Sequence, residues 1–385
     1  MLDATKNPVC FDGRRLDIED VIALSRGERT PQLSADAAFR ARIANGADFL
    51  DRLLAEDGVV YGVTTGYGDS CTVTIPPELV SALPHHLYTY HGCGAGRSLT
   101  QEETRAVLAA RLTSLSQGMS GVSVALLEQL ERLLQLDILP VIPAEGSVGA
   151  SGDLTPLSYV AAVLCGEREV WYGGQRRATS GVFAELGIAP LRLRPKEGLA
   201  IMNGTAVMTG LACLAWERAD YLCRLATRIT AMNVVASAGN AHHFDEVLFA
   251  VKPHAGQQNV ASRLRQDLAS DRPARNEQRL QDRYSLRCAP HVIGVLEDAL
   301  PFFRTLIENE LNSANDNPII DAENERVLHG GHFYGGHIAF AMDGLKNVVA
   351  NVADLLDRQL ALLVDTRFNH GLPSNLSGAT GPRAA

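Results

Sequence analysis

The stretch GSVGASGDLTPLSY, residues 146–159, carries residue types that suit an unusual reaction of the main chain. If Ala150, Ser151 and Gly152 are held tightly bent, the amide nitrogen of Gly152 can attack the carbonyl carbon of Ala150 and close a five-membered ring. Loss of water from that ring and from the Ser151 side chain then leaves an exocyclic methylidene, which is an electrophile. Glycine suits the attacking position because it has no β-carbon, and small neighbours let the backbone approach itself.

Two other structures fit the same residues. A glycine-rich turn could cap a helix through Ser151 or Asp153, with the helix beginning at DLTP. For an isolated GASGD segment this capping turn is the commoner structure, so the reactive interpretation depends on further motifs. A phosphate-binding loop needs a following Gly-Lys-Ser or Gly-Lys-Thr, which the sequence lacks, so a P-loop is excluded.

The stretch resembles the signature of the aromatic amino acid ammonia-lyase family, the histidine, tyrosine and phenylalanine lyases with their aminomutase relatives. In that family Ala-Ser-Gly becomes the 4-methylidene-imidazol-5-one group (MIO), so the resemblance implies MIO at residues 150–152 and no external cofactor. Six further blocks look like family blocks in family order: YGVTTGYG (61–68), LAIMNGT (199–205), QDRYSLRCAPHV (281–292), NDNP (315–318), GGHFYGGH (330–337) and FNHGLPSNL (368–376). The resemblance therefore covers roughly the whole chain.

The resemblance gives Tyr61 the role of the base that removes a β-proton from the substrate. Phenols keep their proton at neutral pH, so neighbours must favour the ionised form. Gly66 and Gly68 are then expected to be hinges of a mobile lid that excludes water, with Gly68 also lining the substrate site. Asp316 and Asn317 of the NDNP block are expected to hold loop backbone rather than react.

Other blocks imply residues that bind the substrate. Arg287 is the expected partner of the substrate carboxylate, because a guanidinium offers two parallel donors to two oxygens. Tyr284, one helical turn earlier, should face the same way and assist the chemistry, and Gln281 should extend this polar stripe at helical spacing. Asn203 resembles the residue that orients the prosthetic group or the substrate amine, and Phe333 resembles the aromatic residue that packs near the MIO ring.

His91, in the segment LPHHLYTYHGCGAG, lies where the family selects the side chain of its substrate. Histidine lyases and some tyrosine lyases and aminomutases carry a histidine there. An imidazole can hydrogen-bond a phenol or another imidazole but would stay unpaired against a bare phenyl ring, so phenylalanine is disfavoured as substrate. Tyr90 stands where histidine lyases usually have serine, which leaves histidine and tyrosine both open.

Three histidines in the segment HGGHFYGGH, His329, His332 and His337, raise the question of a metal site. The segment is glycine-rich, lacks an adjacent carboxylate at ligand spacing, and falls in a block that resembles a family without a metal. We therefore expect no catalytic metal. The remaining paired histidines are expected to be solvated or packed: His85, His86, His242 and His243.

The composition of the chain limits the classes of function. It has 385 residues and a net charge of −9, with one short basic cluster from Arg192 to Lys196, so we expect no nucleic-acid partner. Seven cysteines without a CxxC pair indicate reduced, mostly buried thiols. The N-terminal residues do not resemble a signal peptide, and no apolar stretch is long enough to span a bilayer, so we expect a cytoplasmic protein.

Helical periodicity dominates the sequence outside a Gly/Thr-rich segment at residues 59–78. Ser34 is predicted to cap the first long helix, and REVWYGGQRR predicts a small peripheral hairpin around Gly173 and Gly174. Three long apolar patterns follow at residues 206–238, 289–312 and 339–365, the second with a kink at Pro301. Helices so apolar on all sides need several helical neighbours.

We therefore predict a mainly α protein, a large bundle of long, mostly antiparallel helices with an N-terminal loop-rich region. The resemblance implies a homotetramer whose subunits share active sites. Residues 1–200 are predicted to form an N-terminal helix and loop domain that carries the tripeptide and the Tyr61 loop, and residues 201–385 the central bundle. The chain stops in a polar loop directly after a long helix, so we expect a truncated version of a longer protein, with weak or absent activity if it ends at Ala385.

The sequence thus predicts an ammonia-lyase that removes ammonia from L-histidine or L-tyrosine to give a trans-α,β-unsaturated acid, urocanate or p-coumarate. Two alternatives remain open. A MIO-dependent aminomutase would return the ammonia to the β-carbon and yield a β-amino acid. An inactive structural relative would keep the tripeptide uncyclised.

Overall fold

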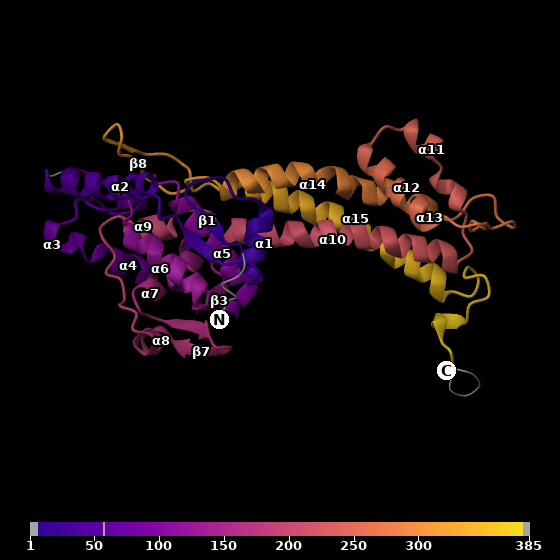
Figure 1. The fold of residues 1–385 in the computed structure, drawn as a ribbon, viewed down its shortest axis with the longest axis horizontal. Helices are drawn as coiled ribbons and strands as arrows, with labels where there is room; N and C mark the ends of the chain where they lie inside the picture. Colours follow the sequence, from indigo (N-terminus) through magenta and orange to yellow (C-terminus); the bar gives the residue numbers. More distant parts are fainter. Residues whose placement is uncertain (1–6, 57, 380–385) are drawn as a thin grey trace. The chain divides into compact units, whose positions relative to one another are not determined.

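The computed structural model describes residues 7–56 and 58–379 and is mainly helical (Figure 1). The chain forms two compact units: unit 1 comprises residues 1–214 and 306–339, and unit 2 comprises residues 215–305 and 340–385. Three long helices contribute residues to both units: α10 (Ala206–Ala236), α14 (Ala289–Leu311) and α15 (Gly336–Val364). The mainly α prediction is confirmed, whereas the division into residues 1–200 and 201–385 stays a prediction.

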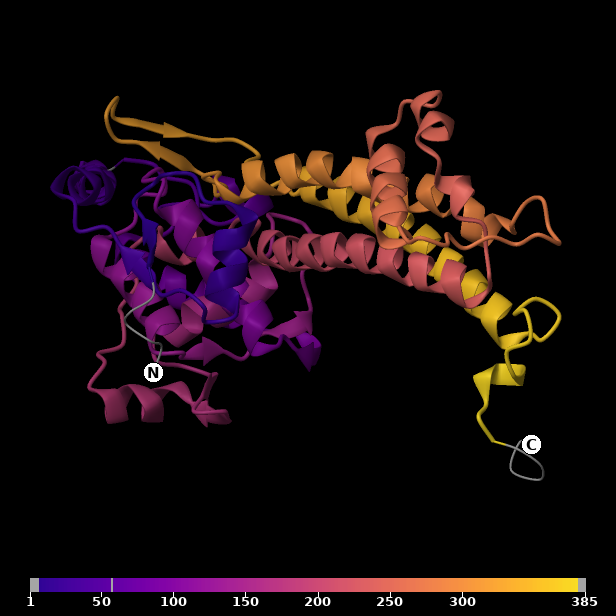
Figure 2. The same cartoon turned by 45° about the vertical axis from the view of Figure 1, so that its right-hand side comes forward.

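In unit 2, segments of these three helices run side by side (Figures 1 and 2). Trp216 of α10 donates from Nε1 to the carbonyl oxygen of Leu300 in α14, at 2.8 Å. Gln359 of α15 donates from Nε2 to Thr230 Oγ1 of α10, at 2.9 Å. Helix α14 runs through Pro301. The shorter elements are η2 (Ala241–Phe244), α11 (Glu246–Ala250), α12 (Ala255–Asp267), α13 (Tyr284–Arg287) and η3 (Ser374–Leu376).

Unit 1 contains a set of shorter helices around a buried one. They are α1 (Ile18–Ser25), α2 (Ala37–Ala55), η1 (Gly68–Thr72), α3 (Pro77–Val80), α4 (Leu83–Tyr90), α5 (Gln101–Leu115), α6 (Val124–Gln135), α7 (Leu154–Leu164), α8 (Thr179–Leu186) and α9 (Glu197–Met202). A capping box of Thr100 and Glu103 starts α5, which is buried along nearly all its length. The predicted cap of α2 was wrong: Asp36, not Ser34, accepts from the backbone N–H of Phe39, at 2.8 Å.

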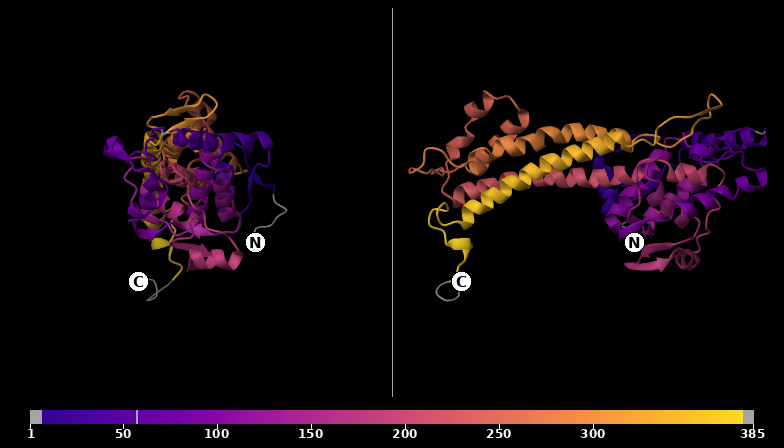
Figure 3. Two further views of the ribbon diagram at one scale, coloured as in Figure 1. Left: turned by 90° about the vertical axis from the view of Figure 1, so that its left-hand side faces the viewer. Right: turned by 180° about the vertical axis from the view of Figure 1, so that it is seen from behind.

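The described strands form four small sheets, all in unit 1. Strands β1 (Val9–Phe11) and β2 (Pro31–Leu33) are parallel; β3 (Ala95–Ser98) pairs antiparallel with β5 (Pro143–Glu145), and β8 (Ile319–Asp321) with β9 (Arg326–Leu328); β4 (Leu139–Pro140), β6 (Glu169–Tyr172) and β7 (Gln175–Ala178) form the fourth sheet. The predicted hairpin is confirmed as β6–β7, at the margin of unit 1 (Figures 1 and 3). The other strands have at most four residues, which is no more than the shortest run in which a sequence alternation can be recognised.

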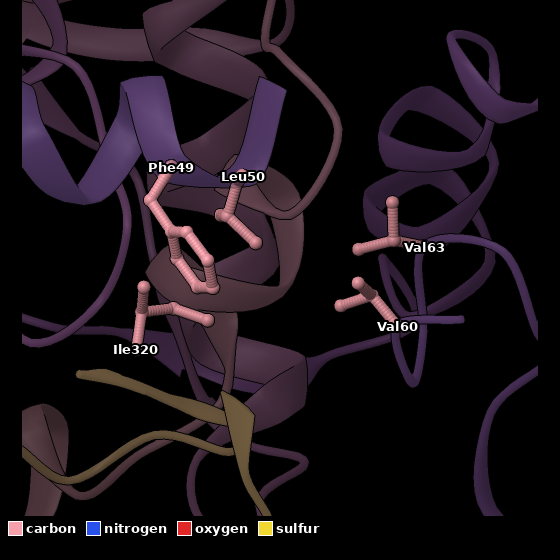
Figure 4. Packing of buried hydrophobic residues seen from close by; sticks show 5 residues of the cluster. All are labelled: Phe49, Leu50, Val60, Val63 and Ile320. Carbon is pink, nitrogen blue, oxygen red and sulfur yellow. The ribbon is translucent and has the colours of Figure 1, made fainter. Parts of the chain in front are cut away.

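A small apolar cluster anchors the loop that carries Tyr61 (Figure 4). Its members are Phe49 and Leu50 of α2, Val60 and Val63 of the loop, and Ile320 of β8, each at most 6% exposed. Two of them flank Tyr61 in the sequence, so their burial fixes the base of the loop. The tip of the loop, η1, contains no buried residue. One end of the loop is therefore held in the core while the other stays exposed.

Two predictions about the surroundings of the chain can be compared with the structure. All seven cysteines are free, but only Cys213 and Cys223 are buried, while Cys71 and Cys93 are exposed and the other three are partly buried, so the prediction of mostly buried thiols was wrong. Among the residues described, no helix combines the length and apolar character needed to cross a membrane.

Candidate active site

A cavity of about 560 Å³ in unit 1 brings together six of the predicted site residues: Tyr61, Gly68, His91, Ser151, Asn203 and Phe333. Ala150 and Gly152 flank Ser151 in the chain. Sequence reasoning gave no site role to the other lining residues: Tyr67, Leu83, His86, Leu87, Tyr90, Leu154, Leu199, Asn317 and Gly330. Five lining residues follow helical spacing along one face of α4 and its C-cap, at i, i+3, i+4, i+7 and i+8: Leu83, His86, Leu87, Tyr90 and His91. This spacing in the sequence could have indicated that they share one face.

The tripeptide segment is sharply bent. Ser151 and Gly152 have φ angles of 59° and 76°, in the left-handed region that glycine adopts readily and serine rarely. Gly149 and Gly152 form an antiparallel bridge across the bend, and Gly152 also bridges to Gly204. A β-carbon placed on Gly152 would lie 2.1 Å from the carbonyl oxygen of Gly204. The bend is therefore pressed against the segment around Gly204, and no side chain fits at position 152.

Asn203 holds the bend from the other side. Its Nδ2 donates to the carbonyl oxygen of Ser151 at 2.7 Å, and the N–H of Asp153 donates to the carbonyl oxygen of Gly204 at 2.7 Å. Asn203 Oδ1 is buried and receives no hydrogen bond from the described residues, so it is an open acceptor. A bent Ala-Ser-Gly segment, a position that accepts only glycine and a donor on the Ser151 carbonyl are what a ring built from residues 150–152 requires. These residues fit MIO.

Asp153 does not act as the side-chain cap that the alternative interpretation required. It precedes α7 but makes no capping hydrogen bond to that helix. Its carboxylate instead accepts from the backbone N–H groups of Val207 and Met208 at the start of α10, at 3.0 and 2.9 Å, and from Ser147 Oγ at 2.9 Å. Burial raises the pKa of Asp153 to about 6, with these hydrogen bonds acting in the opposite direction. The capping interpretation through Asp153 was therefore wrong, because the side chain serves α10.

The raised pKa of Asp153 predicts a pH-dependent stability. In the folded chain the carboxyl keeps its proton up to about pH 6, whereas its ordinary pKa is 3.8. Its contribution to folding is thus complete below about pH 4 and is lost as the pH rises through about 6. Relative to Asp153→Asn, the free energy of unfolding of the wild type should fall by about 3 kcal/mol between about pH 4 and 7. Urea unfolding of both proteins checks this, and a constant difference across that range would contradict it.

Tyr61 accepts a hydrogen bond on its phenol oxygen from the backbone N–H of Gly68, at 2.8 Å. A donor in this position stabilises negative charge on the oxygen, as a phenolic base requires. Its ring contacts that of His329 edge to face, with centroids 6.4 Å apart. Burial raises the pKa of the neighbouring Tyr67 well above its usual range, and the charge of Tyr61 adds to the effect. Tyr67 therefore stays protonated beside it.

His91 ends helix α4 with its ring in the cavity wall. Its Nδ1 lies 2.9 Å from the carbonyl oxygen of Leu87, so a neutral ring that donates there presents Nε2 as an acceptor. Arg168 fixes the same helix turn, because its Nη2 donates to the carbonyl oxygen of Tyr88 at 2.9 Å. The ring of Tyr90 contacts that of His91 at 5.1 Å between centroids. The site thus offers a placed acceptor for a donor on the substrate ring.

Arg287, the predicted partner of the substrate carboxylate, lies in unit 2 together with Tyr284 and Gln281 of the predicted polar stripe, and none of the three lines the cavity of unit 1. Tyr284 and Arg287 are both on α13, where the guanidinium carbon of Arg287 lies 4.7 Å from the Tyr284 ring centroid, so the two do face the same way. Arg287 Nε also donates to the carbonyl oxygen of Asp282 at 3.1 Å. Gln281 precedes the helix in non-helical backbone, so the helical-spacing argument was wrong for it.

Asp316 and Asn317 of the NDNP block make different contacts. Asn317 Oδ1 accepts from the N–H of Gly330 at 2.8 Å, as expected for a residue that holds loop backbone, and it also lines the cavity. Asp316 is fully buried and instead pairs with Lys196, and it accepts from Ser120 Oγ at 3.2 Å. The expectation for Asp316 was therefore wrong. A fully buried lysine needs a charged partner, and Asp316 supplies it.

Two of the other histidines, His243 and His85, have polar partners. His243 is buried and accepts on Nε2 from the N–H of Asp282, at 3.0 Å. His85 lies 3.6 Å from Glu167, while His86 lines the cavity instead of being only solvated. Over the described ranges, no group of three or more His, Cys, Asp or Glu side chains is arranged to hold a metal ion.

Comparison with known proteins identifies the family of the chain. The family model described as aromatic amino acid lyase matches residues 16–384. The histidine ammonia-lyase of Alkaliphilus oremlandii is 36% identical over 97% of this chain and 73% of its own length, and that of Bos taurus 37% identical over 97% and 58%. The chain therefore spans about three quarters of the first of these relatives and less than two thirds of the second.

Solved structures give the same result. Tyrosine aminomutase from Streptomyces globisporus superposes with a TM-score of 0.89 at 35% identity, over 98% of this chain and 74% of that one. Histidine ammonia-lyase from Trypanosoma cruzi does so with a TM-score of 0.85 at 31% identity, over 96% and 69%. The chain belongs to the aromatic amino acid lyase family.

Proposed function

We propose that this chain is a carbon–nitrogen lyase that removes ammonia from L-histidine or L-tyrosine to give urocanate or p-coumarate. Its family and the relatives named histidine ammonia-lyase support the reaction class. The observation that carries the proposal is the bend at residues 150–152, tied by Asn203 to a cavity that Tyr61 and His91 also line. An electrophile and a base on one cavity wall are what an elimination of this kind needs.

The residues of the cavity divide the work. Residues 150–152 would form MIO, and that group would supply an electron-poor alkene to which the substrate amine can add. Tyr61 removes the β-proton, and the Gly68 N–H stabilises the charge left on the phenol oxygen. Asn203 Oδ1 is an acceptor for the amine protons. Phe333, with the apolar residues of α4, helps to exclude water.

We further propose that the assembled protein is a homotetramer with an antiparallel helical bundle, in which another subunit supplies Arg287, Tyr284 and Gln281 to this cavity. Two observations support it. These residues do not line the cavity of unit 1, and Tyr284 is 72% exposed. The unit 2 helices also carry exposed apolar side chains: Tyr221, Met232 and Val235 on α10, Phe302 on α14, and Phe340 and Leu360 on α15. Exposed apolar surface of this kind marks interfaces between subunits.

An assay with three amino acids tests the function. Purified protein is incubated with histidine, tyrosine and phenylalanine, and the conjugated acid is followed by absorbance while its products are separated by chromatography. We expect urocanate or p-coumarate, and intact mass lighter by two waters than the sequence requires. An intact mass equal to that of the uncyclised sequence, together with no product from any of the three amino acids, would show an inactive relative instead.

An aminomutase is the second candidate, and one observation favours it. The tyrosine aminomutase structure covers 98% of this chain with a TM-score of 0.89. The same chromatography separates the two candidates, because an aminomutase yields a β-amino acid from the same substrate. A β-amino acid as the main product would replace the lyase proposal with this one and leave the roles of Tyr61 and residues 150–152 unchanged.

His91 should determine the substrate preference. Replacing His91 by Phe removes the acceptor for a phenol O–H or an imidazole N–H, so that polar substrate group would be left unpaired. We expect kcat/KM for histidine and tyrosine, relative to phenylalanine, to fall by about 10–100-fold. His85→Phe, on the same helix but outside the cavity, is the matched control. A wild-type protein that turns over all three amino acids equally would contradict this role.

A further inference from the structure

Arg111 of α5 is a buried cation that has no role in the proposed function. It is 0% exposed and is among the largest fully buried side chains described. Burial lowers the pKa of its guanidinium to about 10, with the charges of Asp316 and Asp153 acting in the opposite direction, so it remains charged at neutral pH. Burying such a charge costs free energy unless it is paired and hydrogen-bonded. Its contacts therefore indicate what the charge is for.

The guanidinium is joined to the segment that supports the tripeptide. Nη2 donates to the carbonyl oxygens of Ala200 and Asn203, the latter at 2.9 Å, and Nη1 donates to Asn315 Oδ1 at 2.8 Å. Ala200 and Asn203 lie at the C-terminal end of α9, where carbonyl groups lack helical partners and a cation is favourable. Arg111 thus fixes the end of α9 at Asn203.

The same segment contacts the bend on its other side. Asn203 Nδ2 donates to the Ser151 carbonyl, and the carbonyl oxygen of Gly204 lies 2.1 Å from the position that a β-carbon on Gly152 would take. Gly204 itself has no space: an added β-carbon would lie 2.5 Å from Arg111 Nη1. Residues 203 and 204 are therefore confined between the guanidinium and the tripeptide. Because Asn203 contacts both the guanidinium and the Ser151 carbonyl, a shift of the guanidinium would displace the donor on that carbonyl.

A lysine cannot make this set of contacts. Arginine presents several N–H donors in a fixed plane, whereas the ammonium of lysine is a compact charge on a flexible stem. Nearby, Lys196 is paired with the single carboxylate of Asp316, which shows the arrangement that a buried lysine adopts in this core. Replacing Arg111 by Lys would therefore keep the positive charge close to Asp153 and Asp316 but lose the three-point hold on α9 and Asn315.

We propose that Arg111 is a positioning residue for MIO formation, holding Asn203 and Gly204 against the bend while the ring closes. The proposal rests on the proposed function. Ring closure joins the Gly152 nitrogen to the Ala150 carbonyl carbon, and two waters leave. One water carries the Ala150 carbonyl oxygen with the two amide protons of Ser151 and Gly152, and the other carries the Ser151 hydroxyl with its α-proton. No oxidant or co-reactant is needed, so the residue has only to hold geometry.

Intact mass of the full chain, sampled at intervals after cell-free synthesis, measures how fast the two waters are lost. In Arg111→Lys the rate should fall about tenfold or more, because the guanidinium hydrogen bonds to Ala200, Asn203 and Asn315, which hold the segment supporting the bend, are removed. The matched control is Arg105→Lys on the same helix, where the arginine pairs with Asp137 through Nε at 2.7 Å and Nη2 at 2.9 Å, away from the tripeptide. It should lose water as fast as the wild type.

The outcomes separate this proposal from the proposed function. A wild-type chain whose mass never falls by two waters would contradict the proposed function itself. Cyclisation at equal rates in wild type and folded Arg111→Lys, with folding checked by circular dichroism and gel filtration, would overturn the role of Arg111 alone. If Arg111→Lys does not fold, Asn315→Ala is used, since it keeps the cation and removes one acceptor. Slower cyclisation in that folded variant supports the proposal, and an unchanged rate overturns it.

Discussion

Replacing Gly152 by Ala should abolish ring closure, and with it the turnover of any amino acid. The new β-carbon would lie 2.1 Å from the carbonyl oxygen of Gly204, a backbone atom that cannot swing aside. The bend must then open, which moves the Gly152 nitrogen away from the Ala150 carbonyl carbon. Intact mass should match the uncyclised sequence, and activity should fall to the background of the assay.

Gly149→Ala is the matched control for this substitution. Gly149 has a φ of 73°, close to the 76° of Gly152, but a β-carbon there would have no neighbour within 4 Å. Both variants carry the cost of a left-handed alanine, about 1–2 kcal/mol, and Gly152→Ala adds an overpacking cost of about 1–3 kcal/mol. Thermal unfolding and mass are compared for the pair. Loss of the two waters in Gly149→Ala but not in Gly152→Ala assigns the failure of ring closure to the clash, whereas full cyclisation of Gly152→Ala would refute it.

The bend of the tripeptide could be predicted from sequence because it is local. The glycines around Ser151 permit the bend, and both Ser151 and Gly152 have positive φ. What holds the bend could not be predicted, since Asn203 and Gly204 are about fifty residues away in the chain and their contact depends on how α9 packs on α7. The resemblance suggested Asn203, but the spacing of residues did not.

Local patterns failed where a side chain serves a distant element. Asp153 has the position and type of a helix cap, yet its carboxylate binds the start of α10. Lys196 belongs to what looked like a short basic cluster, and it is fully buried against Asp316. Arg111 offered one signal: it lies in AVLAARLTSL, a helical segment that is apolar on most of its sides. A charged residue in such a segment has to be paired inside the core, but its partners lie too far along the chain to be named from the sequence.

Helical spacing gave mixed results for the same reason. Tyr284 and Arg287 face the same way because one turn of helix fixes their relation, and the structure confirms that turn. Gln281 was included by extending the spacing backwards, but α13 begins at Tyr284, after the extended residue Arg283. A stripe of residues predicts a shared face only as far as the helix itself extends.

Replacing Tyr61 by Phe should lower kcat by about 10²–10⁴-fold while leaving the mass of the cyclised chain unchanged. Phenylalanine keeps the ring that contacts His329. The substitution also leaves Val60 and Val63 of the apolar cluster in place, so the loop should hold its position. It removes the oxygen that accepts from the Gly68 N–H and that would take the β-proton. Substrate binding should change little, so KM is expected to stay within a few-fold of the wild-type value.

The control for Tyr61→Phe is Tyr172→Phe, which removes a phenol oxygen from strand β6, outside the cavity, and should leave kcat unchanged. The combination of mass and rate decides what Tyr61 does. A slow enzyme with a fully cyclised tripeptide places the tyrosine in proton removal, because the electrophile is then present and only the base is missing. A wild-type rate in Tyr61→Phe would transfer the role of base to another group on the cavity wall. An uncyclised Tyr61→Phe would instead make the phenol part of ring formation.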